Sequence, residues 1–207
     1  NQADVLKHFV LVRMLRHLLQ KEKAFWFVDT HAGAAQYALN DSTALKNAEF
    51  ETGIGRLWRA RDLPPVLADY VAQVRSFNTA TGTDPARLRR YPGSPQIAMQ
   101  LARAQDRIRC FEKHTSEIRV LQKNLADDPR RATAVAGDGF ELLASVLPPP
   151  SRRGLVLIDP SYEDKHDYRR VKQTLADALT RFATGSYAVW YPQVMRREAM
   201  LMPASLR

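Results

Sequence analysis

The chain has little cysteine and no long apolar segment. Its 207 residues include one cysteine, Cys110, which excludes an internal disulfide framework and any zinc module built from several cysteines. No apolar run approaches the roughly 20 residues that a membrane-spanning helix requires. The first residues lead into an amphipathic helical pattern, not a signal peptide. We therefore expect a cytoplasmic protein that does not contact a membrane.

Acidic residues are outnumbered by basic ones. The chain has 31 Lys and Arg against 22 Asp and Glu, a formal net charge of +9. This excess favours an anionic partner such as a nucleic acid, because phosphate contacts supply most non-specific binding energy, although many soluble proteins are simply basic. The basic residues form short clusters and no run of five or six, which is typical of a folded surface.

Apolar runs alternate with amphipathic segments along most of the chain. Such alternation predicts an α/β fold with a mostly parallel sheet. Bounds follow from the period of the apolar residues and from Gly and Pro at the ends of segments. The expected strands are residues 25–28, 108–111, 133–136, 154–158 and 187–190, and the expected helices are residues 3–20, 96–104, 115–125, 140–147 and 168–182.

Residues 38–90 have a different character. Helical patterns lie near residues 50–61 and 65–77, and no convincing strand falls among them. We interpret this stretch as a helical insertion subdomain that follows the first strand. Residues 1–37 and 91–207 then form the core of the protein.

Four successive predicted strands each end in an acid. These residues are Asp29, Glu112, Asp138 and Asp159. In an open α/β sheet, ligands bind beyond the carboxyl ends of the strands, so four carboxylates there face one crevice. They suit hydroxyl groups, amino groups or a cationic ligand and repel phosphates, so a positively charged nucleoside fits. The alternative is that each acid only caps the helix that follows it.

Two common nucleotide-binding fingerprints are missing. The loop after the first strand, residues 30–35, reads Thr-His-Ala-Gly-Ala-Ala and is not the G-x-G-x-x-G pattern of dinucleotide-binding oxidoreductases. Gly33 in this loop still permits close approach of the backbone to a ligand. The chain also has no G-x-x-x-x-G-K-[ST] phosphate loop, which argues against an NTPase.

The run Asp159-Pro160-Ser161-Tyr162 directly follows an apolar strand. It combines a carboxylate acceptor, a stiffened backbone and an aromatic ring, which is what binding a planar base with an amino group requires. The Asp159 carboxylate and the Pro160 carbonyl can accept both hydrogens of the amine while Tyr162 stacks on the ring. The alternative is an ordinary proline turn after a strand.

This run resembles the [D/N/S]-P-P-[Y/F/W] motif of S-adenosylmethionine-dependent amino methyltransferases. Together with further stretches it resembles the RlmJ family of bacterial 23S rRNA (adenine-N6) methyltransferases, in order, over nearly the whole chain to Pro192. The resemblance implies a Rossmann-like S-adenosylmethionine-dependent methyltransferase fold. The stretches that carry it are residues 3–8, 29–34, 91–95, 138–140, 151–154, 181–185 and 190–192.

The resemblance also implies roles for individual residues. Glu112 is expected to hold the ribose hydroxyls of the cofactor, and Asp138 to bind its adenine. Asp159, Pro160 and Tyr162 are the expected catalytic residues, and Lys7 and Tyr162 the expected substrate contacts. The alternative for Lys7 is an ordinary exposed lysine on a helix. The alternative for His8 and His31 is that they are hydrogen-bonded histidines of the core or of a helix cap. The implied contacts to S-adenosylmethionine come from His8, His31, Ser94, Glu112, Asp138, Gly139 and Asp159.

The chain departs from the family pattern in three places. Ser161 stands where the family has a second proline, which loosens the backbone of the motif. The family pattern begins before Asn1 with a segment thought to contact RNA. It also continues past Pro192, whereas residues 196–207 resemble it poorly. We therefore expect a family member with both ends incomplete.

Three hypotheses for the function remain open at this point. The first is N6-methylation of an adenosine in 23S rRNA with S-adenosylmethionine as cofactor and no metal, carried out by a monomer. The second is the same reaction on adenine in DNA. The third is a non-catalytic nucleic-acid-binding protein on a methyltransferase fold, which the serine at position 161 and the missing ends suggest.

Overall fold

The computed structural model describes residues 1–39, 49–82, 84 and 86–206. Among them, the five strands that the sequence predicts are separated by helices. The helices are α1 (Gln2–Leu19), α3 (Glu49–Thr52), α4 (Ile54–Arg59), α5 (Pro65–Ala80), α6 (Ser94–Leu101), α7 (Thr115–Leu125), α8 (Gly139–Leu142), the 3-10 helix η1 (Leu143–Val146), α9 (Asp167–Arg181) and α10 (Arg197–Ser205). The strands are β1 (Trp26–Asp29), β2 (Gln36–Ala38), β3 (Arg90–Pro92), β4 (Arg107–Glu112), β5 (Ala132–Ala136), β6 (Gly154–Ile158) and β7 (Ser186–Val189).

The five strands predicted from the sequence form one sheet in the order β5-β4-β1-β6-β7. All neighbours in this sheet run parallel. Strand β6 is buried along its whole length, as expected where helices cover both faces of a parallel sheet. The predicted α/β class with a parallel sheet is therefore confirmed.

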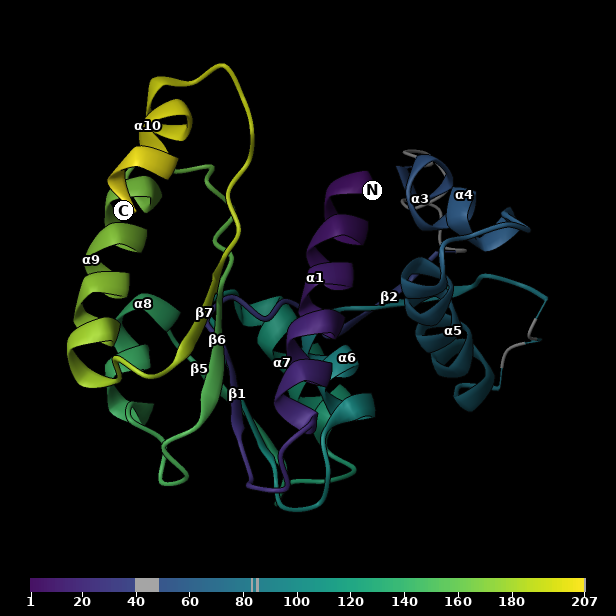
Figure 1. The fold of residues 1–207 in the computed structure, drawn as a ribbon, viewed down its shortest axis with the longest axis horizontal. Helices are drawn as coiled ribbons and strands as arrows, with labels where there is room; N and C mark the ends of the chain where they lie inside the picture. The colour runs from purple at the N-terminus through teal and green to yellow at the C-terminus, as the bar shows by residue number, and fades with distance from the viewer. Residues whose placement is uncertain (40–48, 83, 85, 207) are drawn as a thin grey trace.

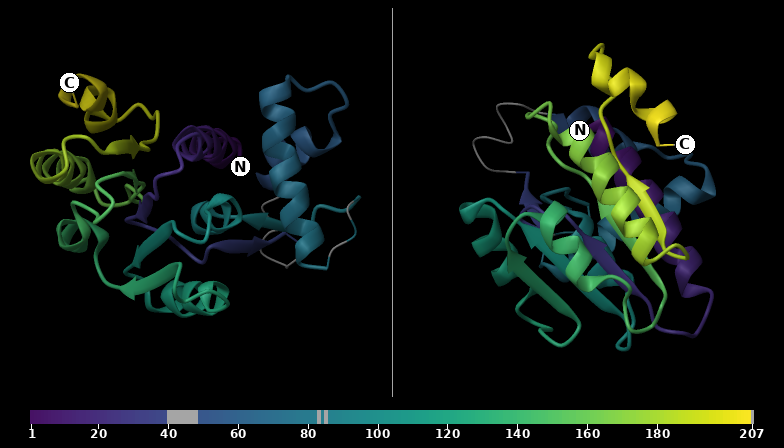
Figure 2. Two further views of the ribbon diagram at one scale, coloured as in Figure 1. Left: turned by 60° about the horizontal axis from the view of Figure 1, so that its bottom comes forward. Right: turned by 90° about the vertical axis from the view of Figure 1, so that its left-hand side faces the viewer.

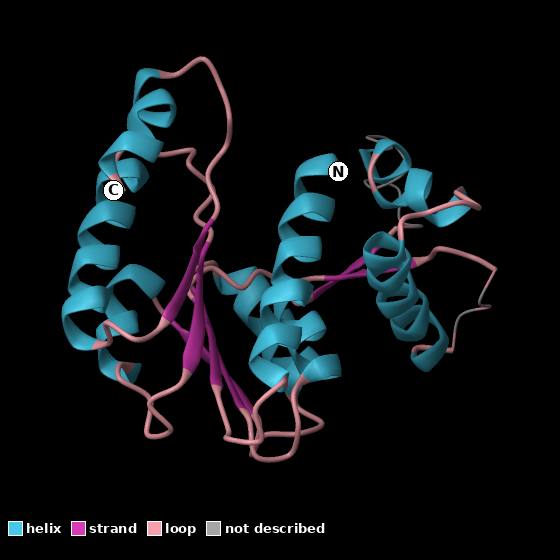
Figure 3. Cartoon of the chain, in the orientation of Figure 1, coloured by secondary structure: helices cyan, strands magenta, loops and turns pink. Residues whose placement is uncertain are grey.

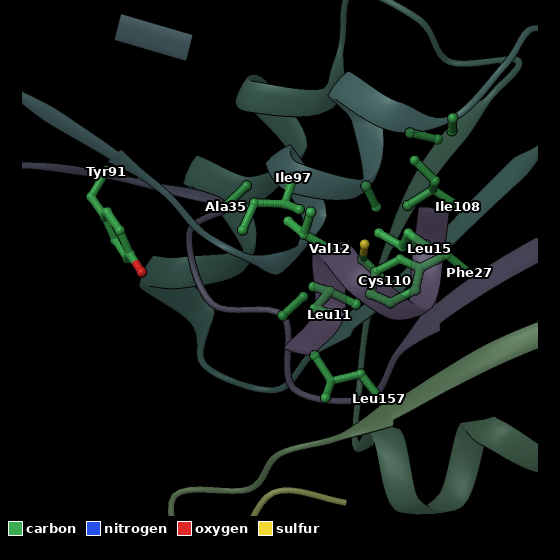
Figure 4. Packing of buried hydrophobic residues seen from close by; sticks show 14 of the residues in the cluster. Leu11, Val12, Leu15, Phe27, Ala35, Tyr91, Ile97, Ile108, Cys110 and Leu157 are labelled. Carbon is green, nitrogen blue, oxygen red and sulfur yellow. The ribbon is translucent and has the colours of Figure 1, made fainter. Parts of the chain in front are cut away.

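Helices cover the two faces of the sheet (Figures 1 and 2). Helices α1, α6 and α7 pack on one face, where their apolar side chains meet Phe27, Ile108 and Leu157 in one buried cluster (Figure 4). Helices α9 and α10 and the short α8–η1 segment cover the other face through a second cluster around Val156 and Ile158. The sheet is thus the middle layer of three, and its carboxyl ends lie between helices of both outer layers.

A small antiparallel pair of strands, β2 and β3, leads from the main sheet toward α3, α4 and α5 (Figure 3). The helical patterns near residues 50–61 and 65–77 correspond to these helices. The sequence did not predict the two strands, because three residues are too few for an alternating pattern. The proposed insertion, residues 38–90, includes residues 40–48, 83 and 85, which lie outside the described part of the chain.

Helix α1 begins at the same edge of the sheet at which the strands end. Asn1 caps it by accepting a hydrogen bond from the backbone of Asp4, whose side chain in turn accepts from the backbone of Asn1. This reciprocal arrangement fixes the first turn of the helix. The start of α1 therefore stands beside the carboxyl ends of β1 and β6. Within the described residues, no helix is long and apolar enough to cross a membrane.

Candidate active site

Two adjoining cavities lie at the carboxyl ends of the strands. Their volumes are about 450 and 600 Å³. The smaller is lined by residues of α1, by the loop after β1 and by Ser94 at the start of α6. The larger extends across the ends of β4, β5 and β6. Both are lined by Lys7, His31, Gly33 and Asp159, so these residues stand where the two cavities meet.

Asp159 forms an ion pair with Lys7 at this junction. The Lys7 Nζ atom lies 2.6 Å from Asp159 Oδ2, and the two side chains are 15% and 16% exposed. Burial raises the pKa of Asp159, although the ammonium of Lys7 opposes the effect. Lys7 also lies 3.2 Å from Asp4, and its pKa is raised by these carboxylates despite its own burial. Lys7 is thus held in the site and is not an exposed helix lysine.

Asp29 lies beneath the cavities and lines neither of them. It is fully buried and accepts hydrogen bonds from the Ser94 hydroxyl at 2.5 Å and from the His31 backbone at 3.2 Å. Burial raises the pKa of Asp29 to about 7, and the charge of Asp159 adds to the effect. Asp29 therefore positions Ser94, which does line the smaller cavity.

Glu112, at the end of β4, lines the larger cavity. It is buried, and its two oxygens accept backbone hydrogen bonds from Gly33 and His114, each at 2.8 Å. These bonds fix the carboxylate and connect the loop after β1 to the loop after β4. Each carboxylate oxygen can accept a second hydrogen bond, so Glu112 retains acceptors for a ligand in the cavity.

Asp138 caps helix α8 and also lines the larger cavity. Its Oδ1 atom accepts from the backbone of Phe140 at 3.0 Å, which is the capping role that the alternative interpretation gave it. Its Oδ2 atom lies 2.9 Å from an Arg170 nitrogen and 3.3 Å from Lys113 Nζ. Although partial burial opposes it, these bonds lower the pKa of Asp138. Gly139, the next residue, packs so closely on the Thr30 carbonyl that a side chain would collide with it.

The two histidines are both partnered and both at the cavities. Thr30 Oγ1 lies 2.8 Å from His31 Nδ1, and the His31 ring meets the edge of Phe140 at 4.6 Å between centroids. His8 Nδ1 lies 2.9 Å from the hydroxyl of Tyr91. Burial lowers the pKa of His31 to about 4 and that of His8 to about 3. Both rings are therefore neutral near pH 7 and present one donor and one acceptor each.

Tyr162 lines the larger cavity and is held tightly there. Its side chain is 4% exposed, its hydroxyl donates to the Trp190 carbonyl at 2.6 Å, and its ring packs against Tyr168 at 4.6 Å. Its backbone adopts a φ of 56°, which is uncommon for a residue with a side chain. Ser161, its neighbour, is exposed. Stacking of a base on Tyr162 stays a prediction and requires the ring face that Tyr168 does not cover.

The structure brings together most of the residues predicted from the sequence. Gly139, Pro160 and the three acids Glu112, Asp138 and Asp159 line the larger cavity, and His8 and Ser94 line the smaller. No sequence pattern indicates Arg170 and Lys113 as partners of Asp138, because they lie on other elements. Tyr91 belongs to the stretch 91–95 that carries the resemblance, but no pattern predicts its role.

A family model described as "Ribosomal RNA large subunit methyltransferase D, RlmJ" matches residues 22–207. The chain belongs to the RlmJ family. The resemblance seen in the sequence motifs is therefore confirmed, and the match includes residues 196–207, for which those motifs gave little support.

Known members and a solved structure agree with this assignment. Ribosomal RNA large subunit methyltransferase J of Haemophilus influenzae is 46% identical over 198 residues, which is 96% of this chain and 69% of that protein. The protein of the same name from Escherichia coli is 45% identical over 202 residues, 98% of this chain and 70% of that protein. The crystal structure of protein LPL1258 from Legionella pneumophila is 35% identical, with a TM-score of 0.90, and covers 100% of this chain and 74% of that one. Two RlmJ proteins are thus similar to this chain in sequence, and LPL1258 is similar to it in sequence and in fold.

Proposed function

We propose that this chain transfers a methyl group from S-adenosylmethionine to the N6 amine of an adenosine in 23S rRNA. The observation that carries the proposal is Asp159, a half-buried carboxylate in an Asp-Pro-Ser-Tyr run where two cavities meet. Membership of a ribosomal RNA methyltransferase family supports the polymer. The position on the nucleotide rests on the chemistry of Asp159 and Pro160.

The cavities fit the proposed cofactor. Buried carboxylates with unfilled acceptor positions, Glu112 above all, suit ribose hydroxyls, and a crevice rich in carboxylates suits a sulfonium. Asp138 would bind the adenine of the cofactor, with Gly139 permitting close approach. His8, His31, Ser94 and Asp159 would complete the contacts. When bound, S-adenosylmethionine supplies an electrophilic methyl group.

Asp159 and Pro160 would position the target amine. Lys7 binds Asp159 Oδ2, so Oδ1 is available to accept one N–H of the amine. No N–H of the described residues is bonded to the Pro160 carbonyl, which is therefore available for the other N–H. Two acceptors fix the plane of the amine and increase electron density on its nitrogen. Positioning and electrostatics of this kind provide most of the rate gain when no covalent enzyme intermediate is needed.

Lys7 and Tyr162 would contact the substrate. Lys7 fixes the Asp159 carboxylate and brings a positive charge to the mouth of the site. An adenosine flipped out of its helix would meet the ring of Tyr162, with Tyr168 supporting the ring from the other side. The serine at position 161 leaves Asp159 and Tyr162 in place, so the proposed contacts do not require the second proline of the family motif.

The proposal includes the finer architecture of the chain. The strand order β5-β4-β1-β6-β7, with the ligand site at the carboxyl ends of the strands, supports a Rossmann-like methyltransferase fold. Residues 1–37 and 91–207 would form its core and residues 38–90 a helical insertion subdomain. That the protein is a monomer in the cytoplasm and uses no metal is part of the same proposal. Among the described residues, no group of three or more His, Cys, Asp or Glu side chains could hold a metal ion.

Methyl transfer measured with tritiated S-adenosylmethionine tests this function against the alternatives. The purified protein is given naked 23S rRNA, assembled ribosomal subunits or plasmid DNA, and labelled RNA is digested and mapped by mass spectrometry. N6-methyladenosine in rRNA supports the proposal, and label only in DNA favours a DNA adenine methyltransferase. If calorimetry detects no binding of S-adenosylmethionine, the protein is a non-catalytic nucleic-acid-binding member of the fold.

A further inference from the structure

Three polar side chains form a buried chain that ends at the smaller cavity. The hydroxyl of Tyr70 lies 2.7 Å from that of Tyr91, and the Tyr91 hydroxyl lies 2.9 Å from His8 Nδ1. Tyr70 is fully buried, and His8 and Tyr91 are 3% and 7% exposed. Tyr70 belongs to α5, Tyr91 to β3 and His8 to α1. This series of hydrogen bonds therefore connects α5, one of the helices that follow β2, to His8 in the wall of the smaller cavity.

Which group donates in each of these two hydrogen bonds follows from Tyr70, the buried end of the series. Within the described residues, the Tyr70 hydroxyl has one hydrogen-bond partner, Tyr91. If Tyr70 only accepted a bond, its own proton would be buried without an acceptor, which costs more than an average hydrogen bond gains. Tyr70 therefore donates to Tyr91. The Tyr91 proton is then directed to His8 Nδ1, which must accept it.

His8 has to be neutral to accept at Nδ1. Its burial and the adjacent Lys7 ammonium both disfavour the charged ring. A neutral imidazole that accepts at one nitrogen carries its proton on the other, so Nε2 is a donor. No hydrogen bond joins Nε2 to another residue in the described part of the chain, and the ring lines the cavity. His8 thus presents its Nε2–H group to the cavity, because the hydrogen bond from Tyr91 to Nδ1 keeps the proton on Nε2.

We propose that Tyr70 and Tyr91 are positioning residues that hold His8 as its Nε2–H tautomer, and that this N–H binds a ligand carboxylate in the smaller cavity. The walls there include Asp4 and Asp159, which repel an anion, and the nearby Lys7 ammonium is already paired with both acids. A carboxylate can stay in such a cavity only if it finds a fixed donor. The amino-acid part of S-adenosylmethionine carries a carboxylate. This assignment of the ligand therefore rests on the proposed function.

The tautomer of His8 can be measured without any ligand. Long-range ¹H–¹⁵N correlation spectra of the cofactor-free protein distinguish a proton on Nε2 from one on Nδ1. We expect the Nε2–H form in the wild-type protein and a mixture of both forms in Tyr91→Phe. A wild-type spectrum with the proton on Nδ1 would overturn the inference even if the cofactor binds.

Calorimetry tests the carboxylate. S-adenosylmethionine is compared with its decarboxylated form, which differs from it by that group alone. We expect the wild-type protein to prefer the carboxylated ligand, and Tyr91→Phe to reduce this preference about tenfold, as loss of one well-placed hydrogen bond does. Tyr70→Phe should reduce it less, since Tyr91 can still donate. Equal preference in the wild type and in both variants contradicts the proposal.

Matched variants separate this role from a structural one. Tyr187→Phe removes a hydroxyl whose partners in the described part of the chain are the Ala178 and Phe182 carbonyls, remote from the cavities, and should leave the preference unchanged. His8→Gln places an amide N–H near the position of Nε2 and should keep part of the preference, whereas His8→Asn should lose it. If neither ligand binds the wild-type protein, the proposed function fails, while the spectra still decide the tautomer.

Discussion

The two ends of the main sheet bury aspartates in opposite ways. At the amino end, Asp106 is fully buried and accepts from the backbones of Phe25 and Arg103 at 3.0 and 2.8 Å and from the Arg103 guanidinium at 3.0 Å. Although burial opposes it, these bonds lower the pKa of Asp106. At the carboxyl end, Asp29 is equally buried, yet among the described residues it accepts only one side-chain and one backbone hydrogen bond, and its pKa is raised to about 7.

The difference lies in what surrounds each acid. Around Asp106, Arg103 and Arg153 also donate to the backbone carbonyls of Lys21 and Lys23, so this end of the sheet is closed by internal bonds. At the carboxyl end, Asp29 lies beneath two cavities that other acids line, Asp159 and Glu112 among them. Carboxylates with perturbed pKa values in a cavity indicate a functional site, whereas fully bonded ones stabilise the fold. The variants below test that distinction, from the largest expected effect to the smallest.

The largest effect is expected from Asp159→Ala. Without the carboxylate, nothing at this position accepts a hydrogen bond from the target amine, and methyl transfer should fall about a thousandfold, the scale of losing one positioned polar group. The measurement is single-turnover transfer of tritiated methyl to rRNA. Calorimetry should still detect the cofactor, with reduced affinity.

Asp159→Asn is the matched variant for this position. Its amide oxygen can still accept from the amine, so its activity should lie between that of the wild type and that of Asp159→Ala. If Asp159→Ala turned over as fast as the wild-type protein, Asp159 would have no role in catalysis. The proposed functional difference between the two ends of the sheet would then be lost.

Asp106→Ala should affect stability and leave the chemistry intact. Removal of the acid leaves two backbone N–H groups and the Nε of Arg103 without an acceptor, which should lower the free energy of unfolding by about 3 kcal/mol. Urea denaturation measures the loss, and methyl transfer by the folded variant should be unchanged. Asp69→Ala breaks a more exposed pair with Arg16 and should cost less than about 1 kcal/mol. Equal losses in the two variants contradict a structural role for the amino end.

Gly139→Ala should reduce both stability and cofactor binding. The added carbon would collide with the Thr30 carbonyl, and overpacking of this kind costs about 2 kcal/mol. The strain moves Asp138 relative to β1, so the affinity for S-adenosylmethionine should fall with it. Gly82→Ala is the control, because Gly82 has a positive φ but open space around it. It should lose a little stability and no affinity. Normal affinity of Gly139→Ala for the cofactor would show that Asp138 and Gly139 do not take part in binding it.

The sequence predicted the local features of this fold well. Strand β6 is Gly154 followed by four apolar residues and ends just before Asp159, and α7 begins and ends at the predicted residues. The acids at the ends of strands were predictable because parallel strands end at a common edge. Strands β2 and β3 were missed, since three residues carry no periodic signal.

Partners across the fold could not be predicted in the same way. Lys7 and Asp159 are 152 residues apart in the sequence, and their contact depends on how α1 packs against the sheet. The same holds for the ion pair of Arg170 with Asp138 and for the hydrogen bond between Tyr70 and Tyr91. Each pair is formed by tertiary packing, and no local pattern distinguishes its members from other lysines, arginines or tyrosines. The sequence thus predicted which acids lie at this edge of the sheet but not which residues hold them.

The smallest effect at any one step of the measurement, about 1 kcal/mol for each pH unit, is the pH dependence that Asp29 contributes. Its folded-state pKa of about 7 exceeds the unfolded value of about 4, so between these values the folded state binds more protons than the unfolded one. Its contribution to stability therefore falls as pH rises, by about 1 kcal/mol per pH unit. Asp29→Asn removes this titration. Measured by urea denaturation of the cofactor-free protein, the variant should gain stability relative to the wild type from pH 5 to pH 7 and then no further.

Asp106 provides the opposite case for the same measurement. Its pKa is lowered, so the stability that it contributes is complete above the unfolded value of about 4 and is lost only at lower pH. The difference between Asp106→Asn and the wild type should therefore stay constant from pH 5 to pH 7. A sloping difference for Asp29→Asn beside a flat one for Asp106→Asn would establish that the two buried aspartates differ in their surroundings and not in their depth. Two flat lines would mean that Asp29 is ionised at pH 5, and the contrast between the ends of the sheet would then reduce to the presence of the cavities.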